Sequence, residues 1–318
     1  MFSVIMPVYN GEKFVSTAVE CVISQTFAEW ELVIVNDGSK DNTLKVLEKY
    51  ADNPKIKVIT QPNGGVSAAR NTAMKNARFD YFAFLDCDDF WFPNHLEILK
   101  KMIDRYPAAG TYSTLANIQL PNGDCITNAS YFENRPDKTD DSIVYIENFI
   151  AEYDRDKMVK TYPSCSCISR AAAEKAGGFR TGCKIGEDLA FFLTAGVYYP
   201  TVLSRDITTI YERGNSTATK DVSFDPDWFF FEEVNDILND REVSDETKQH
   251  LISVMQWFTM RRARHYAIDG RRRDAWKSFK EIGRNPSLAK DKLITFILLL
   301  MPTFLVKKIF MIRWRTQG

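Results

Sequence analysis

The stretch Tyr81-Phe82-Ala83-Phe84-Leu85-Asp86-Cys87-Asp88-Asp89 joins an apolar run directly to three carboxylates. The apolar half is rich in aromatic residues, which predicts a buried strand over 81–86. Three carboxylates within four residues repel one another, and a divalent cation such as Mg²⁺ or Mn²⁺ relieves that repulsion. The stretch therefore predicts a metal site at the end of a buried strand. The alternative is a helix N-terminus with an acidic first turn, because Pro93 and a predicted helix from Asn94 follow.

The residues before this stretch alternate short apolar runs with helical patterns. Three further strands are expected over 2–6, 31–36 and 56–60. Helices are expected between them, over 14–23, from about 42 to 50, and over 65–76. Strands that alternate with helices predict βαβ units and a mostly parallel sheet covered on both faces.

The pattern becomes less regular beyond Gly110, where polar loops rich in Asn, Asp and Pro separate short strands. This part suits a mixed sheet that carries a substrate lobe. From Phe224 onward the pattern is helical and predicts αα-hairpins. The expected domains are 1–220, with a nucleotide-binding half 1–110 and an acceptor half 111–220, and a basic helical region 221–318.

Charge is distributed unevenly along the chain. The 318 residues carry a net charge of -1, yet residues 251–318 contain 15 Lys and Arg against 4 Asp and Glu. An acidic body with a basic tail predicts that the tail meets an anionic partner, either a membrane surface or nucleic acid. Nucleic acid is disfavoured, because the aromatic residues of the tail lie within long aliphatic runs and form no stacking platform.

The run Leu293–Val306 is the most apolar segment of the tail. It has fourteen residues with Pro302 among them, whereas a membrane-spanning helix needs about 20. Lys292, Lys307 and Lys308 flank the run, as in helices that lie in the headgroup layer of a bilayer. The alternative is a buried C-terminal helix whose basic residues are simply solvated.

The compartment can be inferred from the cysteines and the N-terminus. Six cysteines occur without a CxxC pair, which disfavours a disulfide framework and favours a reducing compartment. The start, Met1–Pro7, has neither a basic segment nor a long apolar one, so no signal peptide is expected.

Polar clusters follow three of the expected strands: Pro7–Gly11, Asn36–Ser39 and Asp86–Asp89. Ligands of open α/β sheets bind beyond the carboxyl ends of the strands, so these clusters are expected to converge. Asp37 is either a turn residue or an acceptor of hydrogen bonds from a base or ribose. Arg70, on the helix after Gly64-Gly65, is either a surface residue or a cation presented to phosphates.

Four segments in this order resemble the signature of family-2 inverting glycosyltransferases with a GT-A fold, a Rossmann-like mixed sheet. They are Ser3–Asn10 (SVIMPVYN), Val35–Asp41 (VNDGSKD), Asn63–Asn71 (NGGVSAARN) and Phe84–Asp89 (FLDCDD). The resemblance covers about residues 1–216, and the tail is not part of it.

The resemblance implies donor-binding roles for several residues. A pocket for the nucleotide base, usually uracil, would be lined by Pro7, Tyr9 and Asp37. Arg70 would lie near the base or the phosphates, and Asp86 would contact the ribose side of the donor.

The acidic motif and the second half would supply the chemistry. Asp88 would bind the Mn²⁺ or Mg²⁺ that bridges the diphosphate, with Asp89 as a supporting carboxylate. Glu187-Asp188 resembles the family's Glu-Asp motif at a helix start, where Asp188 would be the general base and Glu187 would support it.

Two further features bear on the resemblance. Tyr211-Glu212-Arg213 falls where the family has a loop that closes over the diphosphate. Glu212 replaces the usual Arg, and Arg213, the expected diphosphate contact, is shifted by one position. The Gln-x-x-Arg-Trp motif of processive synthases is absent, which favours the addition of a single sugar.

The expected function is that of a metal-dependent inverting hexosyltransferase. It would use a UDP-sugar donor and a saccharide acceptor, polyprenyl-diphosphate-linked, in bacterial O-antigen, capsule or exopolysaccharide assembly. The expected location is cytoplasmic, peripheral on the inner face of the cytoplasmic membrane. The alternatives are a sugar nucleotidyltransferase and a non-catalytic module of a polysaccharide-assembly complex.

Overall fold

The computed structural model describes residues 1–120, 122–133, 142–157, 159, 161–183, 186–212 and 230–315. It divides into two compact units, residues 1–223 and 224–318, and each is described by itself. Arg213 lies outside the described residues, so its expected contact with the diphosphate stays a prediction.

The first unit begins with four parallel strands in the order β3-β2-β1-β4. They are β1 (Phe2–Val8), β2 (Trp30–Asn36), β3 (Ile56–Thr60) and β4 (Tyr81–Phe84). The helices between them are α1 (Val15–Ile23), α2 (Thr43–Leu47), which continues as the 3-10 helix η1 (Glu48–Tyr50), and α3 (Val66–Lys75). The predicted alternation of strands and helices is confirmed, but β4 ends at Phe84, two residues before the expected bound.

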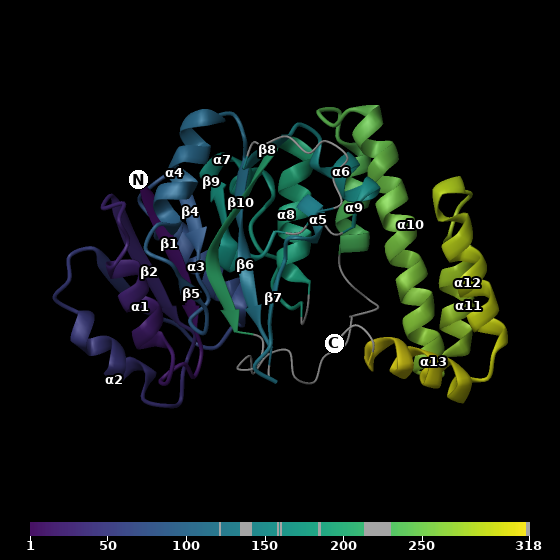
Figure 1. Ribbon diagram of the computed structural model, residues 1–318, viewed down its shortest axis with the longest axis horizontal. Coiled ribbons are helices and arrows are strands. Elements are labelled where there is room, and N and C mark those ends of the chain that lie inside the picture. Colours follow the sequence, from purple (N-terminus) through teal and green to yellow (C-terminus); the bar gives the residue numbers. More distant parts are fainter. Residues whose placement is uncertain are drawn as a thin grey trace. The chain divides into compact units, whose positions relative to one another are not determined.

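The rest of this unit extends the sheet with strands of both directions. It contains β5 (Phe90–Trp91), α4 (His95–Arg105), β6 (Thr111–Gln119), β7 (Cys125–Thr127), α5 (Ser130–Glu133), β8 (Ile143–Ile146), α6 (Phe149–Arg155), the 3-10 helix η2 (Pro163–Cys165), β9 (Ser166–Ser169), α7 (Arg170–Lys175), α8 (Glu187–Tyr198) and β10 (Thr201–Glu212). Strand β9 lies between β4 and β6 and is antiparallel to both, while β6 and β10 are parallel. Figure 1 shows these strands side by side, and the predicted mixed sheet is confirmed.

Helices cover both faces of the sheet, as predicted. Successive side chains of a strand point to opposite faces, so the residues of β1 divide between two cores. Phe2, Val4 and Met6 pack in one core with residues of α1, α2 and α4. Ile5 packs in the other core with residues of α3, α7 and α8. Each face of the sheet is therefore covered by a core of its own.

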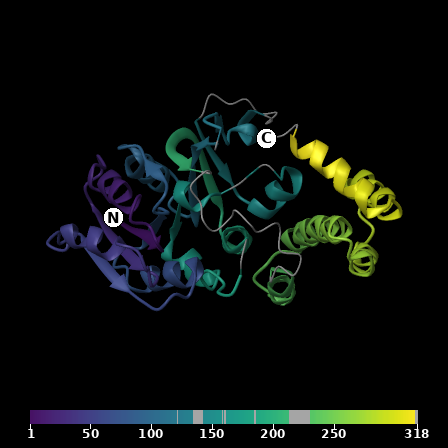
Figure 2. The same ribbon diagram turned by 90° about the horizontal axis from the view of Figure 1, so that it is seen from below.

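The second unit is helical in its described part. It contains α9 (Phe230–Asn239), α10 (Asp245–Ile268), α11 (Arg272–Glu281), the 3-10 helix η3 (Pro286–Leu288), α12 (Ala289–Leu300) and α13 (Thr303–Arg315). The side-chain oxygen of Ser244 accepts a hydrogen bond from the Thr247 amide and so caps α10. Helix α10 packs against α11, α12 and α13, which lie beside it in Figure 1 and, seen from below, in Figure 2.

The apolar run 293–306 does not form one helix. Helix α12 ends at Leu300 and α13 begins at Thr303, with Pro302 between them. Proline lacks an amide hydrogen and its ring clashes with the preceding turn, which ends a helix. Within the described residues, no helix is long and apolar enough to cross a bilayer.

Candidate active site

The loops after β1 and β2 are fastened to each other at one edge of the sheet. The Asn10 amide donates to Ser39 Oγ over 2.9 Å, and the Lys40 amide donates to Asn10 Oδ1 over 2.8 Å. Asn10 has φ 52°, in the left-handed region that Asn tolerates better than most residues. Because β1, β2 and β4 run parallel, the loop after β4 leaves the same edge. The predicted convergence of the three polar clusters therefore follows from the topology.

Asp37 is buried at this edge, and the protein itself supplies its hydrogen bonds. Its Oδ1 accepts from Gln61 Nε2 over 2.7 Å and from the Gly64 amide over 2.9 Å, while its Oδ2 accepts from the Gly65 amide over 2.8 Å. These bonds hold the loop that leads into α3. A carboxylate has about four acceptor sites, so little capacity is left for a ligand. Contact between Asp37 and a base stays a prediction.

The other two residues expected to line the base pocket differ in exposure. Pro7 is buried within β1 opposite Val35 of β2, so its side chain belongs to the sheet. Tyr9, beyond the end of β1, exposes its ring to solvent. Of these two, Tyr9 presents a surface on which a base can stack.

Asp89 is a buried carboxylate that connects three parts of the first unit. Its Oδ1 accepts a hydrogen bond from the Glu212 amide of β10 over 3.1 Å, and its Oδ2 accepts one from the Ser164 hydroxyl of η2. The Asp89 amide closes a turn onto the Asp86 carbonyl over 3.0 Å. Burial raises the pKa of Asp89 well above its usual value, and the nearby carboxylates of Asp86 and Asp88 raise it further. Its contacts are those of a supporting residue.

The carboxylate of Asp88 differs from those of Asp86 and Asp89 in its contacts. Within the described residues, no other residue forms a hydrogen bond or an ion pair with its carboxylate. Burial raises the pKa of Asp88 to about 6, with further contributions from Asp86 and Glu212, while Arg70 opposes them. A hard cation would stabilise the ionised form of this buried carboxylate, and carboxylate oxygens are ligands that Mg²⁺ and Mn²⁺ prefer. Among the described residues, no group of three or more His, Cys, Asp or Glu side chains has the geometry of a complete metal site.

Arg70 lies inside the protein and joins the acidic motif to α8. Its Nη2 donates to both carboxylate oxygens of Asp86, over 2.8 and 2.9 Å, and its Nη1 donates to Glu187 Oε1 over 3.2 Å. The guanidinium also lies over the Phe179 ring, 5.0 Å from its centroid, and the side chain is only 4% exposed. The alternative of a surface residue is wrong. The hydrogen bonds of Arg70 go to protein carboxylates, so its contact with the donor stays a prediction.

The residue after Arg70 holds a second loop of the acceptor half. Asn71 Nδ2 donates to the Phe179 carbonyl over 2.6 Å, and the Phe179 amide donates back to Asn71 Oδ1 over 2.8 Å. Gly178 precedes this pair with φ 75°, and a Cβ there would lie 2.9 Å from Asn71 Oδ1. Helix α3 thus positions both the acidic motif and the segment before α8.

Asp188 is the second residue of α8, so the predicted helix start at Glu187-Asp188 is confirmed. The Leu189 amide donates to its Oδ1 over 2.7 Å. Burial raises the pKa of Asp188, and the positive charge of Arg70 opposes that rise. Burial raises the pKa of Glu187 as well. A carboxylate whose pKa is raised toward neutrality is a better general base than an ordinary surface aspartate.

Sequence reasoning missed one residue of this site, Ser164, and named Tyr211 only as part of the loop expected to close over the diphosphate. The Ser164 hydroxyl accepts from the Asp86 amide over 3.1 Å and donates to Asp89, so it fastens both ends of the acidic turn. The Tyr211 ring lies 5.9 Å from that of Tyr162. Burial raises the pKa of Tyr211, followed by the charges of Asp89 and Asp86. Ser164 lies in an irregular segment without periodicity, and its only sequence signal is the Pro163 that opens η2.

Comparisons with known proteins show the family and the fold of the chain. Residues 3–173 match the sequence model of glycosyl transferase family 2. The chain is 45% identical over 105 residues to the Escherichia coli UDP-Glc:alpha-D-GlcNAc-diphosphoundecaprenol beta-1,3-glucosyltransferase WfgD, a match that covers 32% of this chain and 41% of that protein. It is 36% identical over 130 residues to the chondroitin synthase of Pasteurella multocida, which covers 40% of this chain and 13% of the synthase. The chain therefore spans less than half the length of these curated relatives.

Solved structures show the same fold at low identity. TarS of S. aureus, in complex with UDP-GlcNAc, superposes with a TM-score of 0.63 and 22% identity over 83% of this chain and 72% of that one. A mannosyltransferase of Pyrobaculum calidifontis, in complex with GDP-Man and Mn²⁺, superposes with a TM-score of 0.58 and 15% identity over 96% and 83%. The first unit has the GT-A fold. Since the family match extends over more than half of its length, the chain belongs to glycosyl transferase family 2.

Proposed function

We propose that the chain transfers one sugar from a UDP-sugar to an acceptor hydroxyl, with inversion at the anomeric carbon. The observation that carries this proposal is the Arg70 network, which joins the acidic motif after β4 to the first turn of α8. A transferase needs its donor diphosphate next to the base that activates the acceptor. Arg70 binds Glu187, 117 positions away, and so brings the start of α8 next to the acidic motif.

Asp188 would act as the general base. It would accept the proton of the acceptor hydroxyl while the hydroxyl oxygen attacks the anomeric carbon from the side opposite the nucleotide. A single displacement of this kind inverts the configuration. The raised pKa of Asp188 supports the role, since a more basic carboxylate takes up a proton more readily. Glu187, paired with Arg70, would hold the first turn of α8 in place.

Asp88 would bind Mn²⁺ or Mg²⁺, together with oxygens of the donor diphosphate. A bound metal would neutralise the negative charge that develops on the leaving nucleotide. Since the described residues contain no complete protein cage, the donor would have to supply ligands itself. Asp86 and Asp89 carry hydrogen bonds from Arg70, Ser164 and Glu212 that keep the motif in shape.

The remaining donor contacts are proposed from the resemblance to family-2 glycosyltransferases and from the solvent exposure of the side chains. Tyr9 would stack on the uracil base, with Pro7 and Asp37 shaping the wall behind it. Asp86 would face the ribose with the part of its carboxylate that remains exposed. Arg213 would contact the diphosphate from the segment after β10.

We further propose a lipid-linked acceptor, a polyprenyl-diphosphate saccharide at the inner face of the cytoplasmic membrane, in the assembly of a bacterial surface polysaccharide. The name of the E. coli relative specifies a diphosphoundecaprenol acceptor for that protein. The excess of 15 basic over 4 acidic residues in 251–318 supports a location at an anionic membrane surface.

The experiment is a screen of UDP-sugars and GDP-sugars with the full chain, in which released nucleotide diphosphate is measured with MnCl₂ and with EDTA. We expect release from a UDP-sugar that requires the metal and stops in EDTA. Nuclear magnetic resonance of the product would report the anomeric configuration. Retention of configuration would contradict the single displacement. Release of pyrophosphate from a nucleoside triphosphate would instead identify a sugar nucleotidyltransferase, and absence of turnover with every donor would favour a binding module.

A further inference from the structure

Helix α12 has an apolar face that stays largely exposed, although Phe296 also packs against the rings of Trp276 and Phe279 of α11. Leu293, Phe296, Ile297 and Leu300 are between 40 and 63% exposed. Their spacing of three and four residues places them on one side of the helix. Thr295, Leu298 and Leu299 are buried on the opposite side. Single exposed apolar side chains are ordinary, whereas a continuous stripe of four marks an interaction surface.

A further exposed apolar side chain follows the corner at Pro302. Phe304 of α13 is 69% exposed. The corner is fixed by Arg272 of α11, whose Nη2 donates to the Leu299 carbonyl over 2.7 Å and whose Nη1 donates to the Met301 carbonyl over 2.7 Å. These bonds satisfy carbonyls that the helix end and Pro302 leave without amide partners. The exposed face is therefore a built feature of the fold.

The segment that contains this face has an excess of basic residues, 15 Lys and Arg against 4 Asp and Glu in 251–318. Each of the four acidic residues of 251–318 is placed against a basic residue of the same unit: Asp269 against His265, Asp274 against Arg271, Glu281 against Arg262 and Asp291 against Arg264. The remaining cations include the exposed Lys290, Lys307 and Lys308 on α12 and α13. The 15 Lys and Arg outnumber the 4 Asp and Glu, so residues 251–318 carry a net positive charge.

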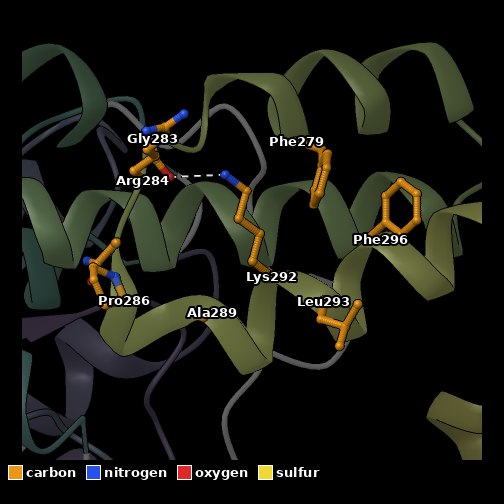
Figure 3. Close-up of a pocket in the computed structure, with 9 residues that line it drawn as sticks. Phe279, Gly283, Arg284, Pro286, Ala289, Lys292, Leu293 and Phe296 are labelled. Carbon is orange, nitrogen blue, oxygen red and sulfur yellow. Dashed lines mark hydrogen bonds between the residues drawn. The ribbon is translucent and has the colours of Figure 1, made fainter.

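A groove beside the stripe combines apolar walls with cations (Figure 3). It has a volume of about 410 Å³ and lies between the end of α11 and α12, with Phe279, Leu293 and Phe296 among its walls. Lys292 donates through Nζ to the Ile282 carbonyl over 2.7 Å and to the Gly283 carbonyl over 3.0 Å. An ammonium group has three N–H donors, so one is left for an anion. Arg284 lies at the same end of the groove.

We propose that the stripe Leu293, Phe296, Ile297, Leu300 and Phe304 enters the headgroup layer of an anionic phospholipid bilayer, with α12 lying parallel to the membrane plane. A stripe of aliphatic and aromatic side chains next to lysines matches the boundary between acyl chains and anionic headgroups. A second copy of the chain would bring the exposed lysines on α12 and α13 of both copies together, and like charges repel. The inference rests on the membrane location in the proposed function and adds the face and the residues that make the contact.

The test is co-flotation of the full chain with vesicles of phosphatidylglycerol and phosphatidylethanolamine, compared with vesicles of phosphatidylcholine alone. We expect binding to the anionic vesicles that weakens as salt rises. The triple variant Leu293→Asn, Ile297→Asn, Leu300→Asn should lose about tenfold or more in vesicle affinity, because apolar burial drives insertion. The matched control is Leu44→Asn, Val58→Asn, Ile126→Asn, three exposed apolar residues of the first unit, which should bind like the wild type.

A second variant tests the electrostatic part. Lys290→Gln, Lys307→Gln, Lys308→Gln should weaken binding to anionic vesicles and reduce its dependence on salt, without involving any packed residue. Equal binding of the wild type and the stripe variant would overturn the proposal. A concentration-dependent dimer in light scattering that the stripe variant abolishes would overturn it as well, in favour of a contact between copies.

The outcome can be separated from that of the proposed function. Hydrolysis of the UDP-sugar without vesicles should be the same in the stripe variant and the wild type. Vesicle binding by a chain that turns over no donor would leave the surface assignment intact and contradict the enzymatic proposal alone.

Discussion

Replacement of Arg70 tests the network that holds the proposed site together. In Arg70→Met, Asp86 loses two charge-assisted hydrogen bonds and Glu187 loses one. The carboxylates are 26% and 13% exposed, so water can replace only part of what is lost. Breaking a buried ion pair by removal of one partner costs about 3–5 kcal/mol. We expect about 3 kcal/mol, the lower end, because Asp86 keeps some contact with solvent.

The effect is measurable as a change in stability. A loss of 1 kcal/mol lowers the melting temperature of a unit of this size by roughly 2–4 °C, so Arg70→Met should melt about 6–12 °C below the wild type. Arg70→Lys keeps the charge but lacks the planar fork, so it should recover part of the loss. Differential scanning calorimetry and urea unfolding measure both variants.

Kinetics then separate this role from direct donor binding. Arg70 lowers the pKa of Asp188, so its removal should move the acid limb of the pH–rate profile to higher pH. If Arg70 mainly bound the donor phosphates, Arg70→Met would raise the KM for the donor and leave the melting temperature near that of the wild type. That result would refute the network as described.

Two further predictions concern single residues of the site. In Asp88→Ala, Mn²⁺ should no longer stimulate donor turnover. In the wild type, the affinity for Mn²⁺ measured by calorimetry should fall as the pH drops through about 6, because the pKa of Asp88 is raised to that value and a protonated carboxyl cannot bind a cation. An affinity that stays constant between pH 7 and 5 would contradict the assignment. Ser164→Ala leaves the Asp86 amide and Oδ2 of Asp89 without their partner, and should cost about 1–3 kcal/mol in urea unfolding. Ser67→Ala is the control and should be near neutral, because its buried hydroxyl has no partner among the described residues. Equal losses in the two variants would show that the bonds of Ser164 contribute nothing.

The nucleotide-binding half could be predicted from the sequence because its strands pair with neighbours and carry their own periodicity. Residues 31–36 and 56–60 alternate with helical segments, and the structure places β2 and β3 within one residue of those bounds. The acceptor half could not be predicted in the same way. Strand β9 enters antiparallel between β4 and β6, a pairing between segments more than fifty residues apart that leaves no local pattern.

Among the site residues, local motifs could be predicted and long-range contacts could not. The motif after β4 and the start of α8 are local and could be located. The contact between Arg70 and Glu187 could not be predicted, because the two residues are 117 positions apart and only the folded sheet brings them together. The exposed side of α12 could not be predicted from the sequence either. The sequence shows a run that is apolar on every side, and only the packing of Thr295, Leu298 and Leu299 determines which side stays exposed.

Asp188→Asn tests the central claim most directly. Asparagine has nearly the same shape but cannot accept the proton, and loss of a general base lowers turnover by roughly 10²–10⁴-fold. The measurement pairs the rate of sugar transfer with calorimetric binding of UDP-sugar in the presence of Mn²⁺. The account predicts that transfer falls by that factor while the dissociation constant of the donor changes less than about threefold. Transfer at the wild-type rate, or a loss of donor binding as large as the loss of turnover, would contradict Asp188 as the base.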